Sequence, residues 1–320
     1  MAKVVALGEL LIDFAQISVD DKGYPTMKAN PGGAPCNYLA ALAKYGVSTD
    51  FIGKVGDDAF GKMLVNTLNE ANIGTNGIVF DENTFTTLAF VTNDERGDRS
   101  FSFARKPGAD TCLEWDEVDK SLIDQCEIFH FGTLSLTDEP SKSATEKAVA
   151  YAKEQGKLIS FDPNLRRPLW KNMADARKAI EWGLHQADIV KISDEEVAYF
   201  WRELVGEYEA IYLMRNMGVK LIMVTKGAQG ALIANVDHIV EVKAPSVNAI
   251  DTTGAGDIFG GSAVARFLET GKPADKLTAA ELEYIGKYAA TAASLSTEKQ
   301  GGIPSVPDKN TVLEKMAAEE

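Results

Sequence analysis

The chain has 320 residues, of which 45% are hydrophobic and 25% are charged, so it can bury a large core. Its 47 acidic and 33 basic side chains give a formal net charge of −14. Such an acidic surface repels a polyphosphate backbone, which argues against nucleic acid as a partner. The sequence contains no apolar run of about 18 residues or more, and we therefore expect no membrane partner either.

The first residues and the cysteines indicate the compartment in which the protein works. The N-terminus enters an apolar, strand-like run directly, without the basic region, long apolar region and cleavage site of a signal peptide. Cys36, Cys112 and Cys126 are widely spaced and form no CxxC pair, so we expect reduced thiols and no zinc site. Together these features predict a cytoplasmic protein.

Short apolar runs rich in β-branched residues alternate with amphipathic stretches along most of the chain. Near-continuous apolar strands separated by helices indicate a parallel sheet that is covered on both faces. We therefore predict an α/β fold, with a doubly wound and mostly parallel sheet and helices on both faces. Strands are expected at residues 3–10, 50–55, 127–134, 157–162, 188–192 and 220–225, and helices at about 34–45, 60–71, 141–155, 174–186 and 195–204.

Two segments depart from this alternation. Residues 16–30 are polar and lie between the first strand and the first helix, while residues 84–109 alternate polar and apolar side chains around a turn at 94–98. The second pattern predicts an antiparallel hairpin, which must lie outside a parallel sheet. We predict one domain, 1–320, with a β lid formed by about 14–30 and 84–110 over the open end of the sheet. The alternative is a surface hairpin without a function.

Three glycine-rich stretches could bind a phosphate. The first, Gly56-Asp-Asp-Ala-Phe-Gly-Lys-Met63, follows a predicted strand and differs from the P-loop pattern at one position. Met63 stands where that pattern needs a hydroxyl for magnesium, and Asp57 and Asp58 would repel the phosphates. A tight turn that leads into a helix is the better interpretation.

The second stretch, Pro31-Gly-Gly-Ala-Pro-Cys-Asn37, leads into an apolar helix. Gly32 and Gly33 allow the backbone to approach a ligand, and the helix start offers free N–H groups. Asn37 can both donate and accept hydrogen bonds, which suits a ligand with many hydroxyls. An ordinary glycine turn before a helix would look the same, so this stretch decides nothing by itself.

The third stretch, Asp251-Thr-Thr-Gly-Ala-Gly-Asp257, precedes a helical pattern at 258–269. Its Gly-Ala-Gly core would place free N–H groups at the helix start, where they can stabilise negative charge on a transferred phosphate. Asp257, in the first turn, could take a proton from an alcohol. An anion hole beside a base is what phosphoryl transfer to a hydroxyl requires. The spacing does not fit the dinucleotide-binding GxGxxG pattern, and a simple helix cap by Thr253 is the remaining alternative.

Taken in order, these and other motifs resemble the ribokinase-like (PfkB) carbohydrate kinases. The similarity runs nearly from end to end of the chain, and the first strand with the Pro-Gly-Gly stretch resembles the fructokinases most within that family. Seven motifs in the right order are far more specific than any one of them. They are Gly8-Glu9 with Asp13, followed by 32–37, 53–61, 162–166, 191–196, 225–230 and 251–257.

The resemblance implies roles for individual residues, with ATP and Mg²⁺ as cofactors. Asp257 would be the general base, the amides of 254–256 the anion hole, and Arg166 a contact of the transferred phosphate. The implied catalytic residues are Asp257, Gly254, Ala255, Gly256 and Arg166; the sugar-binding residues are Asp13, Gly32, Gly33, Asn37, Arg105, Asn164 and Asp257; and the nucleotide-binding residues are Ser193, Thr225, Lys226, Gly227, Gly230, Gly254, Gly256 and Ala290.

Two cation sites are also implied by the resemblance. Glu196 matches an acidic residue that organises Mg²⁺ through water. Beside the anion hole, a K⁺ site would be formed in several cases by backbone carbonyls, although the ammonium of Lys299 would compete with the ion. The residues of that site are Asp251, Thr253, Ser296, Lys299, Gly301 and Ser305. The nucleotide site departs from the family at Ser193, where many members have asparagine, and at Lys226, which either reaches the phosphates or is solvated.

These implications predict transfer of the γ-phosphoryl group of ATP to a hydroxyl of a ketohexose, with fructose giving fructose 6-phosphate. The same machinery would serve a 2-keto-3-deoxygluconate kinase, whose acid substrate needs a cation. A catalytically silent sugar-binding regulator is a third alternative, and an NAD-dependent oxidoreductase a remote fourth. Exposed lid strands could pair between two copies, so we expect a homodimer through the lid. The cations available for an acid substrate are Arg96, Arg99, Arg105, Lys106 and Arg167.

Overall fold

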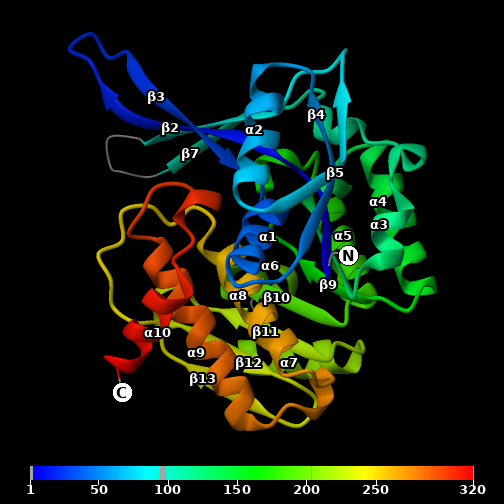
Figure 1. Ribbon diagram of the computed structural model, residues 1–320, viewed down its shortest axis with the longest axis vertical. Helices are drawn as coiled ribbons and strands as arrows, with labels where there is room; N and C mark the ends of the chain where they lie inside the picture. The colour runs from blue at the N-terminus through cyan, green and yellow to red at the C-terminus, as the bar shows by residue number, and fades with distance from the viewer. Residues whose placement is uncertain (1–2, 94–98, 203, 320) are drawn as a thin grey trace.

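The computed structural model describes residues 3–93, 99–202 and 204–319 and places most of them around one large sheet (Figure 1). The order of its nine strands is β13-β12-β11-β10-β9-β8-β1-β4-β5. The strands from β11 to β5 in this order are all parallel, and β12 and β13 join the β11 edge through antiparallel pairs. The strands are β1 Val4–Leu7, β4 Thr49–Gly56, β5 Ile73–Asp81, β8 Ile128–Gly132, β9 Leu158–Asp162, β10 Ile189–Ser193, β11 Leu221–Thr225, β12 Ala231–Ala234 and β13 Ile239–Val242.

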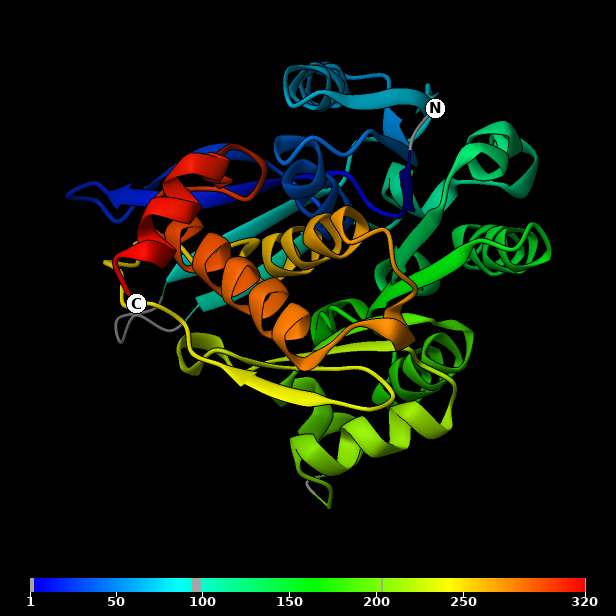
Figure 2. The ribbon, with the colours of Figure 1, turned by 60° about the horizontal axis from the view of Figure 1, so that its bottom comes forward.

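Helices cover both faces of this sheet (Figure 2). Each face has its own apolar core. Successive side chains of a strand point to opposite faces, so Val4 and Ala6 join one core while Val5 and Leu7 join the other. The first core packs against α1, α2, α8, α9 and α10, and the second against α3 to α7. The predicted doubly wound α/β fold is therefore confirmed. The helices are α1 Ala34–Lys44, α2 Ala59–Glu70, α3 Lys120–Gln125, α4 Ser141–Glu154, α5 Met173–Gln186, α6 Asp194–Phe200, α7 Glu207–Asn216, α8 Ala255–Glu269, α9 Ala279–Ser296 and α10 Lys309–Ala317.

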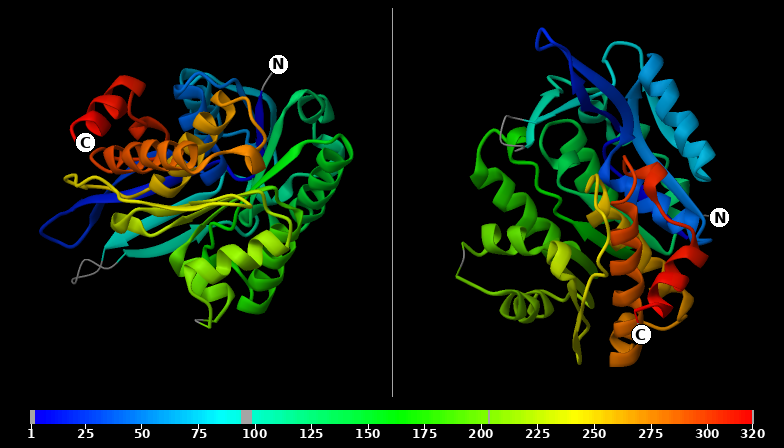
Figure 3. Two further views of the ribbon diagram at one scale, coloured as in Figure 1. Left: turned by 90° about the horizontal axis from the view of Figure 1, so that it is seen from below. Right: turned by 90° about the vertical axis from the view of Figure 1, so that its left-hand side faces the viewer.

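A second sheet has four strands in the order β3-β2-β6-β7. β2 pairs antiparallel with β3 and parallel with β6, and β6 pairs antiparallel with β7. The far ends of β2 and β3 project past the body of the molecule (Figure 3), and this hairpin exposes Ile17, Val19 and Tyr24. The strands are β2 Leu11–Val19, β3 Pro25–Gly32, β6 Leu88–Asn93 and β7 Arg99–Ala104.

The predicted elements differ from the structure in a few places. β6 and β7 confirm the hairpin predicted at 84–109, although its turn at 94–98 lies outside the described residues. Residues 16–30, which were predicted as a polar segment of the β lid, contain the end of β2 and most of β3. Few of their side chains are buried, so the strands carry no apolar alternation. The helix predicted at 195–204 ends as α6 at Phe200, before the left-handed Arg202.

No helix in the described ranges is long and apolar enough to cross a membrane.

Candidate active site

The start of α1 forms one wall of the candidate site. Gly33 precedes the helix with φ 120°, and a Cβ at this position would lie 2.4 Å from the Glu9 carbonyl oxygen, so glycine is required. The Glu9 carboxylate accepts a hydrogen bond from the Ala34 amide at 2.9 Å, which fixes the helix start beside the end of β1. Asn37, in the first turn, is buried and points toward α8.

The start of α8 lies directly against the start of α1. Gly254 precedes the helix in the left-handed region at φ 77°, and Asp257 lies in the first turn, as predicted, with 6% of its surface exposed. Asn37 Nδ2 donates to Asp257 Oδ2 at 2.9 Å across 220 residues of sequence. The fold thus brings a predicted sugar-binding residue and the predicted base together at two helix starts, where backbone amides lack intrahelical partners.

The surroundings of Asp257 determine whether it can act as a base. Burial raises the pKa of its carboxyl, whereas the Lys191 charge, the Asn37 hydrogen bond and the Arg166 charge lower it, in decreasing order of effect. Asn37 Oδ1 is buried and has no hydrogen-bond partner among the described residues. An open acceptor beside a buried carboxylate suits a ligand that brings hydroxyl groups.

Asp13 and Gly32 lie close together where β2 begins and β3 ends. A Cβ at Gly32 would lie 2.2 Å from Asp13 Oδ2, so the carboxylate occupies the space of a side chain. Burial raises the pKa of Asp13 to about 6; the Arg166 charge lowers it, and the Asp257 and Asp251 charges raise it. These couplings place the predicted sugar residue of the second sheet within electrostatic reach of the predicted base.

Asn164 and Arg166 follow β9, at the carboxyl ends of the parallel strands where ligands of such sheets bind. Asn164 is buried and has a left-handed φ of 41°, and its amide donates to Asp162 Oδ1 at 3.1 Å. A cavity of about 10 Å³, with room for one water, separates Asn164 and Asp162 from Glu9 and Ala34. Arg166 lowers the pKa of both Asp13 and Asp257, so its charge acts on both walls of the site.

Most predicted nucleotide-binding residues lie at the carboxyl ends of β10 and β11. The strand register pairs Ser193 with Thr225. Ser193 caps α6: its hydroxyl accepts from the Glu196 amide at 3.2 Å, and the Glu196 carboxylate accepts from the Ser193 amide at 2.9 Å. Gly227 and Gly230 follow β11 with left-handed φ values of 53° and 108°. The hydroxyl that replaces the usual asparagine is therefore already engaged in a helix cap.

Lys226 and Ala290 are placed differently from expectation. Lys226 forms an ion pair with Glu241 of β13, and this contact is the first cause of its raised pKa. Its side chain is 13% exposed, so it is not solvated, and a contact with ATP phosphates would require the ion pair to break. Ala290, on α9, is 3% exposed and belongs to the first core.

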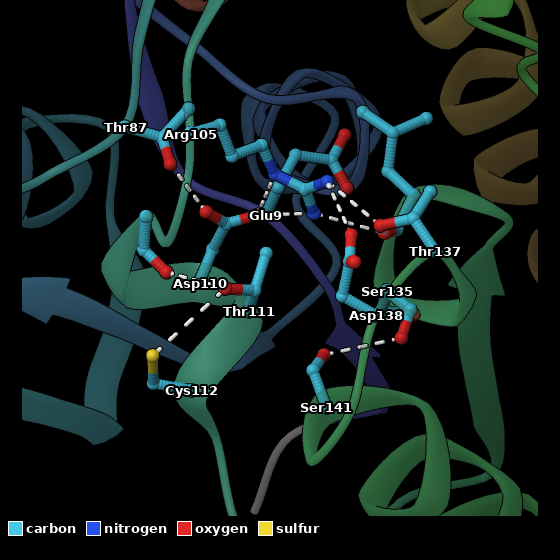
Figure 4. Close-up of polar contacts among 12 residues, drawn as sticks. Glu9, Thr87, Arg105, Asp110, Thr111, Cys112, Ser135, Thr137, Asp138 and Ser141 are labelled. Atoms are coloured by element: carbon cyan, nitrogen blue, oxygen red, sulfur yellow. Dashed lines mark hydrogen bonds and ion pairs between the residues drawn. The ribbon is translucent and has the colours of Figure 1, made fainter. Parts of the chain in front are cut away.

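Arg105, predicted to reach the sugar from the lid, lies in a buried network at the root of the second sheet (Figure 4). Its guanidinium pairs with Asp110 at 2.7 Å and donates to the Leu134 carbonyl and the Thr137 hydroxyl. Asp110 also accepts from Thr87, which directly precedes β6. Only 6% of Arg105 is exposed, so the predicted sugar contact would require these bonds to break.

Glu196 fits a role in holding Mg²⁺ through water better than direct ligation. One of its carboxylate oxygens accepts from the Leu165 amide and the other from the Ser193 amide. Among the residues that the structure describes, no group of three histidine, cysteine or acidic side chains could hold a metal ion. A Mg²⁺ in this site would therefore take most of its ligands from nucleotide oxygens and water.

Asp251 joins the two segments of the predicted K⁺ site. Its Oδ1 accepts from the Thr253 amide and hydroxyl, and its Oδ2 accepts from the Gly301 amide at 3.0 Å. The hydroxyls of Ser296 and Ser305 donate to carbonyls within their own helical turns, which leaves backbone carbonyls as the natural cation ligands.

Lys299, the residue expected to compete with K⁺, is exposed. Together with the stronger effect of Lys44, its charge lowers the pKa of Asp308 on the far side of the loop. The ammonium therefore has an acidic neighbour of its own.

Two buried charged residues beside the base received no role from the sequence. Lys191 of β10 forms an ion pair with Asp162 of β9, with 2.9 Å between Nζ and Oδ2, and neither side chain is more than 10% exposed. The sequence does contain a signal for these two buried charges. A lysine interrupts the apolar strand at 189–192, and an aspartate ends the apolar strand at 158–162. Charges in such positions are rarely buried without a partner or a function.

Comparison with known proteins extends the resemblance over the whole chain. Residues 1–309 match the family described as "pfkB family carbohydrate kinase". Fructokinase-2 from Zea mays is 39% identical over 320 residues, which cover 98% of this chain and 94% of that protein. Fructokinase-1 from Oryza sativa subsp. japonica is 38% identical over 317 residues, which cover 98% and 97%.

Solved structures share the fold over nearly the whole length of the chain. The fructokinase from Xylella fastidiosa has a TM-score of 0.90 at 30% identity, with 100% of each chain covered. A double mutant of fructokinase from Vibrio cholerae O395, with fructose, ADP and a potassium ion bound, has a TM-score of 0.87 at 30% identity, with 99% of this chain and 98% of that chain covered. The similarity therefore includes every segment that contributes to the candidate site.

Proposed function

Because the chain belongs to the pfkB family of carbohydrate kinases, we propose that it phosphorylates fructose to fructose 6-phosphate with ATP as the donor. The observation that carries this proposal is the Asp257 carboxylate, which is buried in the first turn of α8 and bonded to Asn37. The maize and rice relatives are named as fructokinases, and the Vibrio enzyme binds fructose and ADP together. These names support fructose as the substrate of this chain.

The proposed reaction is an in-line displacement at the γ-phosphorus. Asp257 accepts the proton of the attacking hydroxyl while the bond from the γ-phosphorus to the bridging oxygen breaks and ADP leaves. The amides of Gly254 to Gly256 and the Arg166 guanidinium stabilise the charge on the phosphoryl oxygens. Asn37 Nδ2 donates to Asp257 Oδ2 and so holds the base in place, while Asn37 Oδ1 is left to accept a hydrogen bond from a sugar hydroxyl.

The cations have supporting roles in this proposal. When bound, Mg²⁺ would neutralise the triphosphate, and Glu196 would hold its water shell beside Ser193. K⁺ would be held by backbone carbonyls of the segments that Asp251 joins, close to the start of α8. Neither ion replaces the proton transfer to Asp257.

An ADP-release assay with four acceptors tests the proposed function. We expect MgATP turnover that depends on fructose and exceeds turnover with ribose, adenosine or 2-keto-3-deoxygluconate, with ATP alone as the control. If no acceptor raised ADP release above that of ATP alone, while calorimetry showed sugar binding, the chain would instead be a silent regulator. Preference for the acid would identify the closest alternative.

The Arg105 network weighs against the acid substrate. A 2-keto-3-deoxygluconate kinase needs a free cation for the substrate carboxylate, but the charge of Arg105 is balanced by Asp110. Arg167 lies over the ring of Tyr199, with 5.4 Å from Cζ to the ring centroid. Arg96, a further candidate, lies outside the described residues. The balanced charge of Arg105 therefore favours a neutral ketohexose.

We further propose that the second sheet is a lid that closes over the sugar and excludes water. Asp13 and Gly32 link this sheet to the sugar site, and removal of the tip at 94–98 should raise the ratio of ATP hydrolysis to transfer. An unchanged ratio and an unchanged sugar affinity would remove the lid from the proposal.

The exposed hairpin of β2 and β3 supports a homodimer through the lid. Ile17, Val19 and Tyr24 are 54%, 50% and 67% exposed. Light scattering on Ile17→Lys, compared with the native chain, tests this interface; equal masses would count against it.

The three free cysteines support a reducing, cytoplasmic location.

A further inference from the structure

Strand β10 carries a lysine where its neighbours are apolar. Ile189 points into the core beneath α8, and Lys191, two residues further on the same face, is 8% exposed. A buried ammonium is unfavourable unless an opposite charge balances it. Asp162, beside it at the end of β9, provides that charge, with 2.9 Å between Lys191 Nζ and Asp162 Oδ2.

The Lys191 ammonium lies immediately behind the start of α8. A Cβ at Gly256 would lie 3.0 Å from Lys191 Nζ, and a Cβ at Gly260 would lie 3.9 Å from Lys191 Cβ. A side chain at position 256 would therefore press against the ammonium. Only the backbone of the first turn separates this charge from the proposed anion hole.

We propose that Lys191 is a positioning residue whose ammonium, held by Asp162 behind the start of α8, keeps Asp257 ionised and strengthens the positive potential of the adjoining amides. This inference rests on the proposed function of the same site. Lys191 acts through Asp257 and the backbone of α8, and Asp162 acts by holding the ammonium in place.

The charges around Asp257 support this role. Burial raises the pKa of Asp257, and Lys191 has the largest of the opposing effects. Burial also works to lower the pKa of Lys191, but the neighbouring acids outweigh it and the pKa lies above its ordinary value, so the side chain stays charged. Without Lys191, the base would face three acids and one arginine. The charged groups facing it are Lys191 on β10, Arg166 after β9, Asp162 on β9, Glu196 on α6 and Asp13 on β2.

Two substitutions that break the same ion pair separate an electrostatic role from a structural one. Lys191→Met removes a positive charge, and Asp162→Asn removes a negative one. With saturating fructose and MgATP, we expect Lys191→Met to move the acidic limb of the kcat–pH profile upward by about one unit and to lower kcat about tenfold at neutral pH. Asp162→Asn should leave that limb in place or move it downward. Shifts in the same direction, or no shift in either variant, would overturn the proposal.

Lys54→Met is the matched control for loss of a buried lysine. Lys54 pairs with Glu117 at 2.7 Å and Asp81 at 3.5 Å, away from α8. This variant should lose stability but keep the native pH profile, and a shift as large as that of Lys191→Met would contradict the proposal.

A double variant covers the case in which Lys191→Met does not fold. Lys191→Met/Asp162→Asn leaves neither partner buried alone, and its acidic limb should still lie above that of the native enzyme, because Lys191 affects Asp257 more strongly than Asp162 does. A native profile in this variant would overturn the inference alone. Failure of the native protein to phosphorylate any sugar would overturn the proposed function.

Discussion

The start of α8 and the second sheet hold the two parts of the proposed reaction in contrasting ways. At α8 the reacting groups are buried, with Asp257 6% and Asn37 4% exposed. In the second sheet, the ends of β2 and β3 are largely exposed, with Ile17 at 54%. Buried groups are fixed by their neighbours, whereas strands with few buried contacts open at low cost. In the proposed reaction, proton transfer would therefore depend on a fixed base, and sugar enclosure on a sheet secured chiefly at its root.

That root contains a buried polar network in addition to the apolar contact of Ile12 with the first core. Arg105 follows β7 and Thr87 precedes β6, and both bond to Asp110 in the body. Directional bonds fix the orientation of an element more sharply than apolar contacts, because each group has few acceptable partners. Substitutions at α8 should thus impair turnover, and substitutions at the root should impair sugar binding.

The largest effect is expected from Asp257→Ala. Loss of a general base typically lowers the rate about 10²–10⁴-fold, so kcat should fall by at least that factor while the Kd of ATP stays near the native value. Asp175→Ala, which removes an acid from the first turn of α5, is the control. If turnover of Asp257→Ala stayed within about tenfold of native, another group would have to accept the proton.

A smaller effect is expected from Gly254→Ala, compared with Gly271→Ala at the other end of α8. Both glycines are left-handed, at φ 77° and 63°, so each alanine should cost about 1–2 kcal/mol of stability. At Gly254 a Cβ would also lie 2.9 Å from Gly302 Cα and 3.0 Å from Asn37 Nδ2, whereas at Gly271 it would meet nothing within 4 Å. We expect about a tenfold loss of kcat for Gly254→Ala only, because its Cβ displaces the residue that holds the base. Equal kcat values in the two variants would contradict this account.

Asp110→Asn should separate the lid root from the base. Arg105 would lose its counter-ion, and the KM for fructose should rise about threefold or more while kcat and the KM for ATP change little. Glu117→Gln, which weakens the partly buried pair with Lys54 elsewhere, is the control in steady-state kinetics. A fall in kcat without a rise in the fructose KM would place the root network in the chemistry instead.

The starts of α1 and α8 could be predicted from the sequence better than the contacts of the second sheet. Apolar strands, the 34–37 and 254–257 helix starts and their glycines are local signals, and the fold needed only to bring Asn37 and Asp257 together. The contacts of Arg105 and Lys226 could not be predicted, because their partners, Asp110 and Glu241, are fixed by how the strands pack. Both residues remain predicted ligand contacts, and the structure adds a partner from the fold for each of them.

Glu9 joins the two regions and provides the smallest predicted effect. Its carboxylate accepts from Ala34 at the start of α1, and burial raises its pKa from 4.5 to about 7 against the backbone hydrogen bonds at Glu9 and Ala34. Between these two values the native state binds more protons than the unfolded chain, so the free energy of unfolding must fall as the pH rises through this window. Glu9→Gln keeps an acceptor for Ala34 but cannot ionise.

Urea unfolding of Glu9→Gln at about pH 5 and about pH 8 should reveal this linkage. Relative to the native chain, the variant should gain roughly 1–3 kcal/mol on going from the lower to the higher pH. Glu281→Gln is the control with the opposite sign: hydrogen bonds from Lys272 and Thr278 lower the pKa of Glu281 to about 2, so its contribution is lost only as the pH falls below 4.5. It should therefore show a constant offset between the two conditions. If Glu9→Gln did the same, the Glu9 carboxyl would already be ionised at the lower pH, with the backbone hydrogen bonds at Glu9 and Ala34 and the Arg105 charge outweighing the effect of burial.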